Sequence, residues 1–145
     1  MKTLTRLFLV AVAMAFCFTG VAQARDDDEG GCSVASLRGL YVFAASGYNI
    51  VAGAAQPKAI LESIRFDGNG TLTVPSATVS LNGAIVHFPP NGTGTYTVAS
   101  DCTGTLAFAS GPTFDLFLAP RGGDFFMIQT TPSTVLQGTV VKLSR

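Results

Sequence analysis

The amino-acid sequence predicts an all-β protein, a small antiparallel up-and-down barrel of about 8–9 strands, with a two-sheet β-sandwich as the alternative. Short β-rich runs follow one another at a spacing of roughly 8–12 residues, as in sandwiches and barrels. Glycine and asparagine turns separate these runs. No segment after the N-terminal region shows the apolar period of a helix, which excludes a βαβ sheet. A barrel is favoured because an antiparallel meander with short turns removes its exposed edges by closing on itself.

The first segment, residues 1–24, predicts a cleaved secretory signal. A basic start precedes an unbroken apolar run over residues 7–18, and residues 22–24 (Ala-Gln-Ala) form the small-x-small pattern that signal peptidase cuts after. The apolar run is too short to span a bilayer about 30 Å thick, which takes roughly 20 residues. We therefore expect a mature chain without a membrane anchor, starting at Arg25 and located in the periplasm or secreted.

The next segment, residues 25–31, predicts a disordered acidic leader ahead of a single β-barrel domain over residues 32–145. It reads Arg-Asp-Asp-Asp-Glu-Gly-Gly and offers no apolar side chain to bury. The signal contains two of the nine basic residues and none of the nine acidic ones, so the mature net charge is 7 − 9 = −2. Without a basic patch, neither nucleic acid nor an anionic membrane surface is an expected partner.

Two of the three cysteines remain after signal cleavage, because Cys17 lies in the apolar run. In an oxidising compartment, pairing is the default state of Cys32 and Cys102. Their disulfide would close a loop of about 70 residues and contribute roughly 4 kcal/mol in the chain-entropy model.

The strands can be placed from their turns and their alternation. Asp67-Gly68-Asn69-Gly70 and Asn82-Gly83 predict tight turns because Gly and Asn tolerate positive φ. Pro75 predicts a bulge or an edge position. Residues 125–128 are apolar on both faces, so this strand is either covered on both sides or presents an apolar face to a partner, which includes a homodimer. The expected strands cover residues 40–46, 60–67, 71–80, 84–88, 95–99, 105–109, 113–119, 124–131 and 134–143.

Several motifs resemble known barrel proteins. The run Leu37-Arg38-Gly39-Leu40-Tyr41 is similar to the opening of lipocalin-like (calycin) barrels, in which a Gly-x-Trp plugs the base; Tyr41 stands at the Trp position. Further motifs are Ser36-Leu37-Arg38-Gly39, Phe66-Asp67-Gly68-Asn69-Gly70, Gly94-Thr95-Tyr96-Thr97-Val98, Asp101-Cys102-Thr103-Gly104-Thr105-Leu106 and Phe126-Met127-Ile128-Gln129-Thr130. In this order they resemble a group of uncharacterised secreted bacterial proteins. The resemblance implies a bacterial origin and a lipocalin-like or allene-oxide-cyclase-like barrel, and it carries no catalytic residues across.

Three polar residues are candidates for ligand binding: Glu62, His87 and Tyr96. Glu62 is the only glutamate after the leader, and it shares a period-2 face with apolar neighbours such as Ile64. A carboxyl on a buried face needs a partner such as Arg38 or Arg65, or else has a raised pKa. A salt-bridged wall residue is the structural alternative. His87, the only histidine, alternates within a strand, which favours a place in the wall or at the rim.

The sequence predicts no catalytic residues, no metal site and no cofactor. No Gly-x-Ser-x-Gly elbow frames a nucleophile. Zinc needs three or four clustered ligands, which one histidine and two disulfide-bonded cysteines cannot provide. The glycines of Gly68-x-Gly70 form a turn with no helix after it, so they cannot cradle a nucleotide.

The favoured function is a secreted, non-enzymatic barrel protein that binds a small apolar ligand or a protein partner. One alternative is a periplasmic protease inhibitor whose segment 25–31 enters the enzyme's cleft, by analogy of form. The other is a cyclase- or isomerase-type enzyme, which requires Glu62, His87 and Tyr96 to converge on the lumen.

Overall fold

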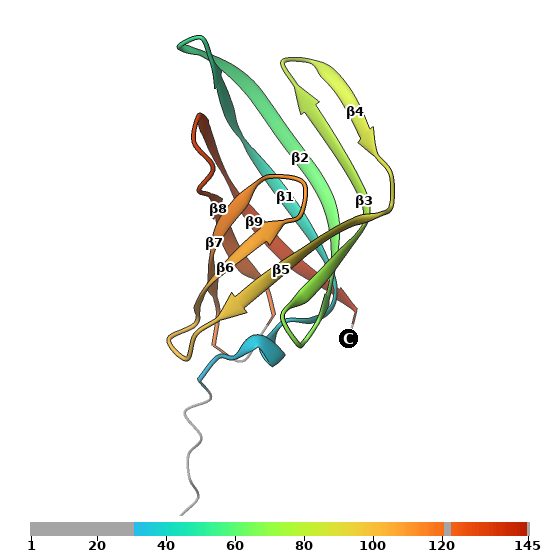
Figure 1. Ribbon diagram of the computed structural model, residues 1–145, viewed down its shortest axis with the longest axis vertical. Helices are drawn as coiled ribbons and strands as arrows, with labels where there is room; N and C mark the ends of the chain where they lie inside the picture. Colours follow the sequence, from blue (N-terminus) through green and yellow to red (C-terminus); the bar gives the residue numbers. More distant parts are fainter. Residues whose placement is uncertain (1–30, 121–122, 145) are drawn as a thin grey trace, which may run out of the picture.

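The structure, a computed structural model, describes residues 31–120 and 123–144, and it confirms the all-β barrel (Figure 1). The expected signal and almost all of the acidic leader lie outside the described residues. Every strand pairing is antiparallel, in the order β2-β1-β9-β8-β7-β6-β5-β3-β4. A β2–β3 pairing closes eight strands into a barrel and leaves β4 as an addition. The elements are η1 (Val34–Ser36), β1 (Arg38–Val51), β2 (Ala54–Asp67), β3 (Thr71–Leu81), β4 (Ala84–Phe88), β5 (Gly92–Val98), β6 (Thr103–Phe108), β7 (Thr113–Leu118), β8 (Phe125–Gln129) and β9 (Thr134–Ser144).

The first hairpin is much longer than predicted, since β1 and β2 continue through residues 47–59 to a turn at Ala52-Gly53. Gly47 belongs in the strand because β9 crosses it closely: a Cβ there would lie 1.9 Å from the carbonyl oxygen of Val135. Pro57 is tolerated because it lies just beyond the last residue of β2 that pairs with β3. Glycine and proline are both unfavourable within strands, yet this fold requires Gly47 and tolerates Pro57.

The predicted turns and the Pro75 irregularity are confirmed. Asn82 and Gly83 have φ of 48° and 87°, as a two-residue type I′ turn requires. The β2–β3 register shifts next to Pro75, and at the same point β3 exchanges its partner β5 for β4. As a result, the β3–β4 hairpin separates from β5, stays paired with β2 and extends beside the β1–β2 hairpin (Figure 1).

The turn after β2 is held by Asp67. Its carboxylate accepts hydrogen bonds from the Thr71 hydroxyl and from the backbone N–H groups of Asn69 and Thr71, at 2.7 and 3.0 Å for the two N–H groups. The bonds from the Thr71 hydroxyl and from Asn69 stabilise the charged form and lower the pKa of Asp67 to about 2.

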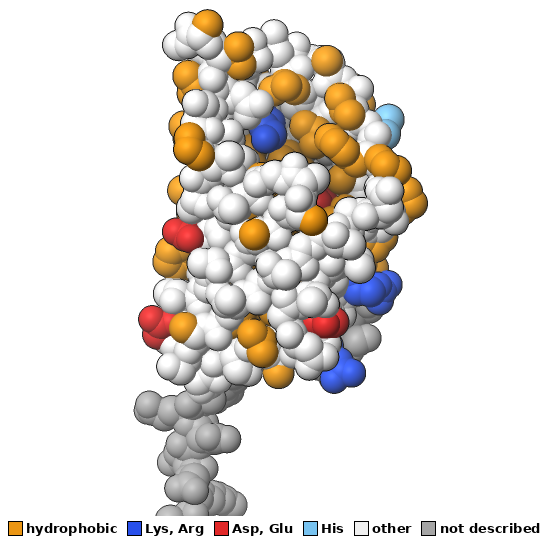
Figure 2. Space-filling model, in the orientation of Figure 1, with side chains coloured by type: hydrophobic (Ala, Val, Ile, Leu, Met, Phe, Trp, Pro, Cys, Tyr) orange, Lys and Arg blue, Asp and Glu red, His pale blue; other side chains and the backbone are white. Residues whose placement is uncertain are grey.

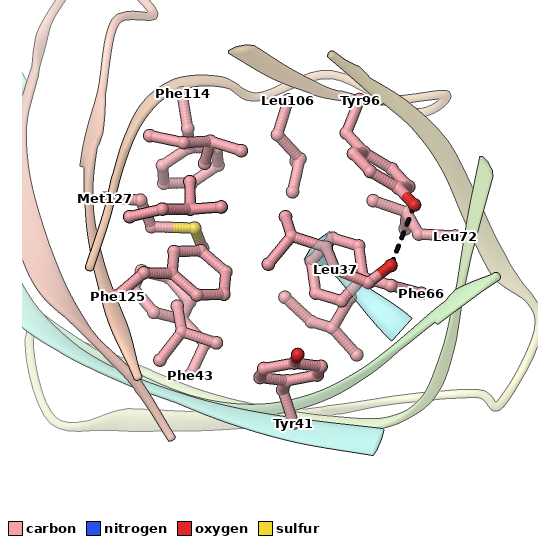
Figure 3. Close-up of a cluster of buried hydrophobic side chains, with 14 of the residues drawn as sticks. Leu37, Tyr41, Phe43, Phe66, Leu72, Tyr96, Leu106, Phe114, Phe125 and Met127 are labelled. Atoms are coloured by element: carbon pink, nitrogen blue, oxygen red, sulfur yellow. Dashed lines mark hydrogen bonds between the residues drawn. The ribbon is translucent and has the colours of Figure 1, made fainter. Parts of the chain in front are cut away.

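Aromatic and aliphatic side chains fill the barrel interior around Leu37, the residue that follows η1 (Figure 3). The rings meet edge to face: Phe66 lies 5.3 Å from Tyr41 and 5.0 Å from Tyr96, and Phe114 lies 5.7 Å from Phe43, between centroids. Such pairs add stability beyond the area they bury. The lower half of the barrel is therefore a packed core. Its fully buried large side chains are Leu37, Tyr41, Phe43, Ile64, Phe66, Leu106, Phe114, Leu116, Phe125, Met127, Leu136 and Val140.

The lower end is closed by η1 and the residue after it, Leu37, which is completely buried. The predicted disulfide is confirmed: Cys32, just before η1, is bonded to Cys102 in the β5–β6 turn. Tyr96 forms a second link. Its hydroxyl donates a hydrogen bond to the Leu37 carbonyl oxygen at 3.0 Å and accepts one from the Gly68 N–H at 3.0 Å. The N-terminal segment is thus tied to two strand turns.

Replacing Tyr96 with phenylalanine should lower the free energy of unfolding by about 1–3 kcal/mol, because it leaves a buried N–H and a buried carbonyl without their partner. Urea denaturation of the mature chain measures the effect. Tyr48→Phe is the matched control, since the Tyr48 ring lies on the outside of β1 and is 48 % exposed. Equal stability of the two variants would show that the Tyr96 hydroxyl does not fasten the base.

Candidate functional site

The upper end of the barrel is open, and the inner face there is more polar than the core. Phe43, Phe108 and Phe114 form the top aromatic layer of the core, with Phe108 only half-buried. Above it, the strand registers place residues of β2, β3 and β4 on one continuous concave face. Figure 2 shows hydrophobic side chains gathered around a hollow at this end of the molecule. We call this the open-end hollow; its wall comprises Lys58, Ile60, Glu62, Ala77, Val79, Val86 and Phe88.

Glu62 is framed by apolar side chains. Phe43 is its neighbour on β1 and Ala77 its neighbour on β3, and antiparallel partners share a face. Ile60 and Ile64 precede and follow it on the same face of β2. The carboxylate is therefore surrounded on all four sides by groups that cannot solvate a charge.

Burial raises the pKa of Glu62 to about 7, and desolvation alone accounts for the rise. Within the described part of the chain, its carboxylate has neither a hydrogen-bond donor nor an ion-pair partner. Arg65 lies on the opposite, exposed face of β2, so it cannot form the salt bridge that was the structural alternative. Glu62 is thus an unpaired acid close to its midpoint at neutral pH.

Lys58 is the other ionisable side chain on this face of β2. Burial lowers its pKa. It is four residues from Glu62, which in a strand is about 13 Å at about 3.3 Å per residue. The two charges therefore stand apart, with Lys58 near the rim and Glu62 deeper, next to the aromatic layer.

Gln129 is a polar residue that the sequence analysis missed. It is only 9 % exposed and follows Phe125 and Met127 on the inner face of β8, opposite Phe114. Its Oε1 is buried with no hydrogen-bond partner in the described residues. The available signal was a single polar side chain at an inward position of an otherwise apolar strand. An orphaned acceptor thus lies beside the same aromatic layer.

The three predicted ligand residues do not come together. His87 is exposed on the outer face of β4, where its Nδ1 lies 3.1 Å from the Thr78 hydroxyl. Tyr96 is buried at the closed end. Only Glu62 lies in the open-end hollow, so the convergence that a cyclase- or isomerase-type site requires is absent from these three residues.

The strand from residue 125 resolves into two faces. Phe125 and Met127 are buried inside the barrel, whereas Phe126 and Ile128 point outward and are 65 % and 43 % exposed. Together with Phe117 on β7, these outward side chains line a shallow groove of about 750 Å³ on the outer wall. The groove is lined mainly by apolar residues together with Ser46, Gln137 and Thr139, and none of its lining residues within the described part of the chain is charged.

Comparison of the chain with protein-family models, with curated proteins and with solved structures finds no match. In residues 31–120 and 123–144, no three His, Cys, Asp or Glu side chains are grouped as a metal site would require. Over those same residues, no helix is both long and apolar enough to cross a membrane.

Proposed function

We propose that this chain is an exported, non-enzymatic barrel protein that binds a small amphiphile in the open-end hollow. The ligand has an apolar body and a hydrogen-bond-donating head, most favourably a cationic amine. The observation that carries the proposal is the unpaired Glu62 carboxylate within an apolar frame at the open end of a closed barrel.

The chemistry of the hollow supports this ligand class. The unpaired Glu62 carboxylate on its wall is a hydrogen-bond acceptor, and an ammonium group offers three donors and no acceptor. Ile60, Val79 and Phe108 supply apolar surface for the body of the ligand. Charge-assisted hydrogen bonds are about twice as strong as neutral ones, which favours an amine over an alcohol.

Export is the second part of the proposal. Its support is the signal-like pattern of residues 1–24 together with the Cys32–Cys102 disulfide, a bond typical of oxidising compartments. The motif succession that resembles secreted bacterial proteins supports the same location and a bacterial origin. A lipocalin-like barrel fits the architecture, since such barrels hold one small ligand at an open end.

The test compares three probes that share one tail: dodecylamine, dodecanol and dodecanoate, each displacing N-phenyl-1-naphthylamine from the mature chain at pH 8. We expect the amine to bind most tightly. Glu62→Gln should weaken the amine by about 10- to 100-fold, which is the usual worth of a charged hydrogen bond. The alcohol should change little.

His87→Gln is the matched control, since His87 lies outside the hollow, and it should leave all three affinities unchanged. The proposal fails if no probe binds, or if Glu62→Gln and His87→Gln bind the amine equally well.

A further inference from the structure

Strand β4 has an unpaired edge. Every other described strand has a neighbour on both sides, whereas β4 pairs with β3 alone. All five of its residues are exposed, and the strand contains no Lys, Arg, Asp or Glu: Ala84, Ile85, Val86, His87 and Phe88. Natural edge strands are usually protected by charged side chains or by proline within the strand. Here the prolines, Pro89 and Pro90, come only after β4 ends.

The hairpin geometry fixes which backbone groups of β4 are free. In a two-residue hairpin, the residues flanking the turn form a hydrogen-bonded pair, here Leu81 and Ala84. Alternation then makes Val86 and Phe88 hydrogen-bonded to β3 as well. The N–H and C=O groups of Ile85 and His87 consequently point away from β3.

These free groups lie symmetrically about Val86, so β4 can pair with β4 of a second copy of the chain. We propose that two copies of this chain pair antiparallel through β4, with the twofold axis at Val86. Ile85 then exchanges two backbone hydrogen bonds with His87 of the partner subunit, and the symmetric contact adds two more.

The side chains also fit this register. Val86 meets Val86 of the partner subunit as a closely spaced, non-hydrogen-bonded pair. The small Ala84 lies opposite the large Phe88 of the partner subunit, and no like charges meet. Phe88 and Ile85, now 52 % and 58 % exposed, lose part of that exposure.

The test measures the mass of the mature chain by sedimentation equilibrium from about 5 to about 500 µM, because small interfaces associate weakly. Wild type should pass from monomer to dimer. Ile85→Pro removes only a free-edge N–H and should stay monomeric, whereas Ile85→Thr keeps the N–H and should still dimerise. Circular dichroism and urea unfolding establish that both variants fold, and if Ile85→Pro does not, His87→Pro takes its place.

A second arm distinguishes this edge from the apolar groove on the outer wall. Phe126→Lys should leave the dimer intact. Under mild oxidation, Val86→Cys should form a covalent dimer much faster than Tyr48→Cys, because only the first cysteine faces its own copy. A monomeric wild type at the highest concentration, or a dimer lost in Phe126→Lys but kept in Ile85→Pro, would overturn the proposal.

Discussion

Replacing both Cys32 and Cys102 with serine should lower the free energy of unfolding by about 3–5 kcal/mol. The disulfide spans 70 residues, and a crosslink over a loop of that length restricts the unfolded chain by roughly 4 kcal/mol in the entropy model. A domain of this size has only about 5–15 kcal/mol in total, so the loss is a large fraction of its stability. Urea unfolding of the oxidised mature chain and of the double variant measures it.

The matched control is wild type unfolded in the presence of a reductant, which should agree with the double serine variant. Hydrogen exchange locates the effect. Protection should fall first around Leu37 and the β5–β6 turn, because the disulfide joins the segment before η1 to that turn. An unchanged urea midpoint in the double variant would contradict the prediction.

Local sequence rules predicted most of the fold, because period-2 alternation and tight turns are short-range signals. Phe114, Leu116 and Leu118 alternate and are all buried, and Asn82-Gly83 forms the expected turn. The rules failed at Gly47, where the reason for a glycine is the backbone of β9, almost ninety positions later in the chain. They also could not distinguish β4 from the eight barrel strands, because barrel closure depends on the long-range pairing of β3 with β2 and β5.

The candidate site was predicted only in part, for a similar reason. Alternation placed Glu62 on a buried face, and the structure adds the apolar neighbours from β1 and β3 that leave it unpaired. Tyr96 has an equally inward position, yet its hydroxyl serves the backbone of Leu37 and Gly68 at the closed end. Position along the barrel axis separates the two residues, and it depends on strand stagger, which a single sequence does not encode in any local pattern.

Glu62 should make the protein less stable as the pH rises. Its folded pKa, about 7, lies above the unfolded value of 4.5, so folding binds a proton between these values. The contribution to stability is complete below pH 4.5 and is lost as the pH rises through 7. It amounts to at most about 3 kcal/mol at 1.36 kcal/mol per pKa unit, and less where water reaches the open end.

Urea unfolding of wild type, Glu62→Gln and Glu62→Leu at pH 5 and pH 8 measures this effect. Wild type should lose stability relative to Glu62→Gln between the two pH values, and Glu62→Leu should be the most stable at pH 8 because it restores an apolar wall. His87→Gln is the control substitution, because His87 lies outside the open-end hollow. Parallel pH dependence in wild type and Glu62→Gln would show that Glu62 is solvated.

The same experiment with dodecylamine present links stability to the proposed function. An ammonium group held at Glu62 favours the charged carboxylate, so it should restore at pH 8 the stability that wild type loses there, and it should do nothing for Glu62→Leu. If position 62 had only a structural role, the Glu62→Leu variant would be the most stable protein, and dodecylamine would not change the stability of wild type. A binding residue, in contrast, destabilises the empty barrel, and a bound cation removes that destabilisation. Binding sites commonly reduce the stability of the fold in this way. If the amine stabilises Glu62→Leu as much as wild type, the hollow binds the apolar tail of a ligand without distinguishing its head group.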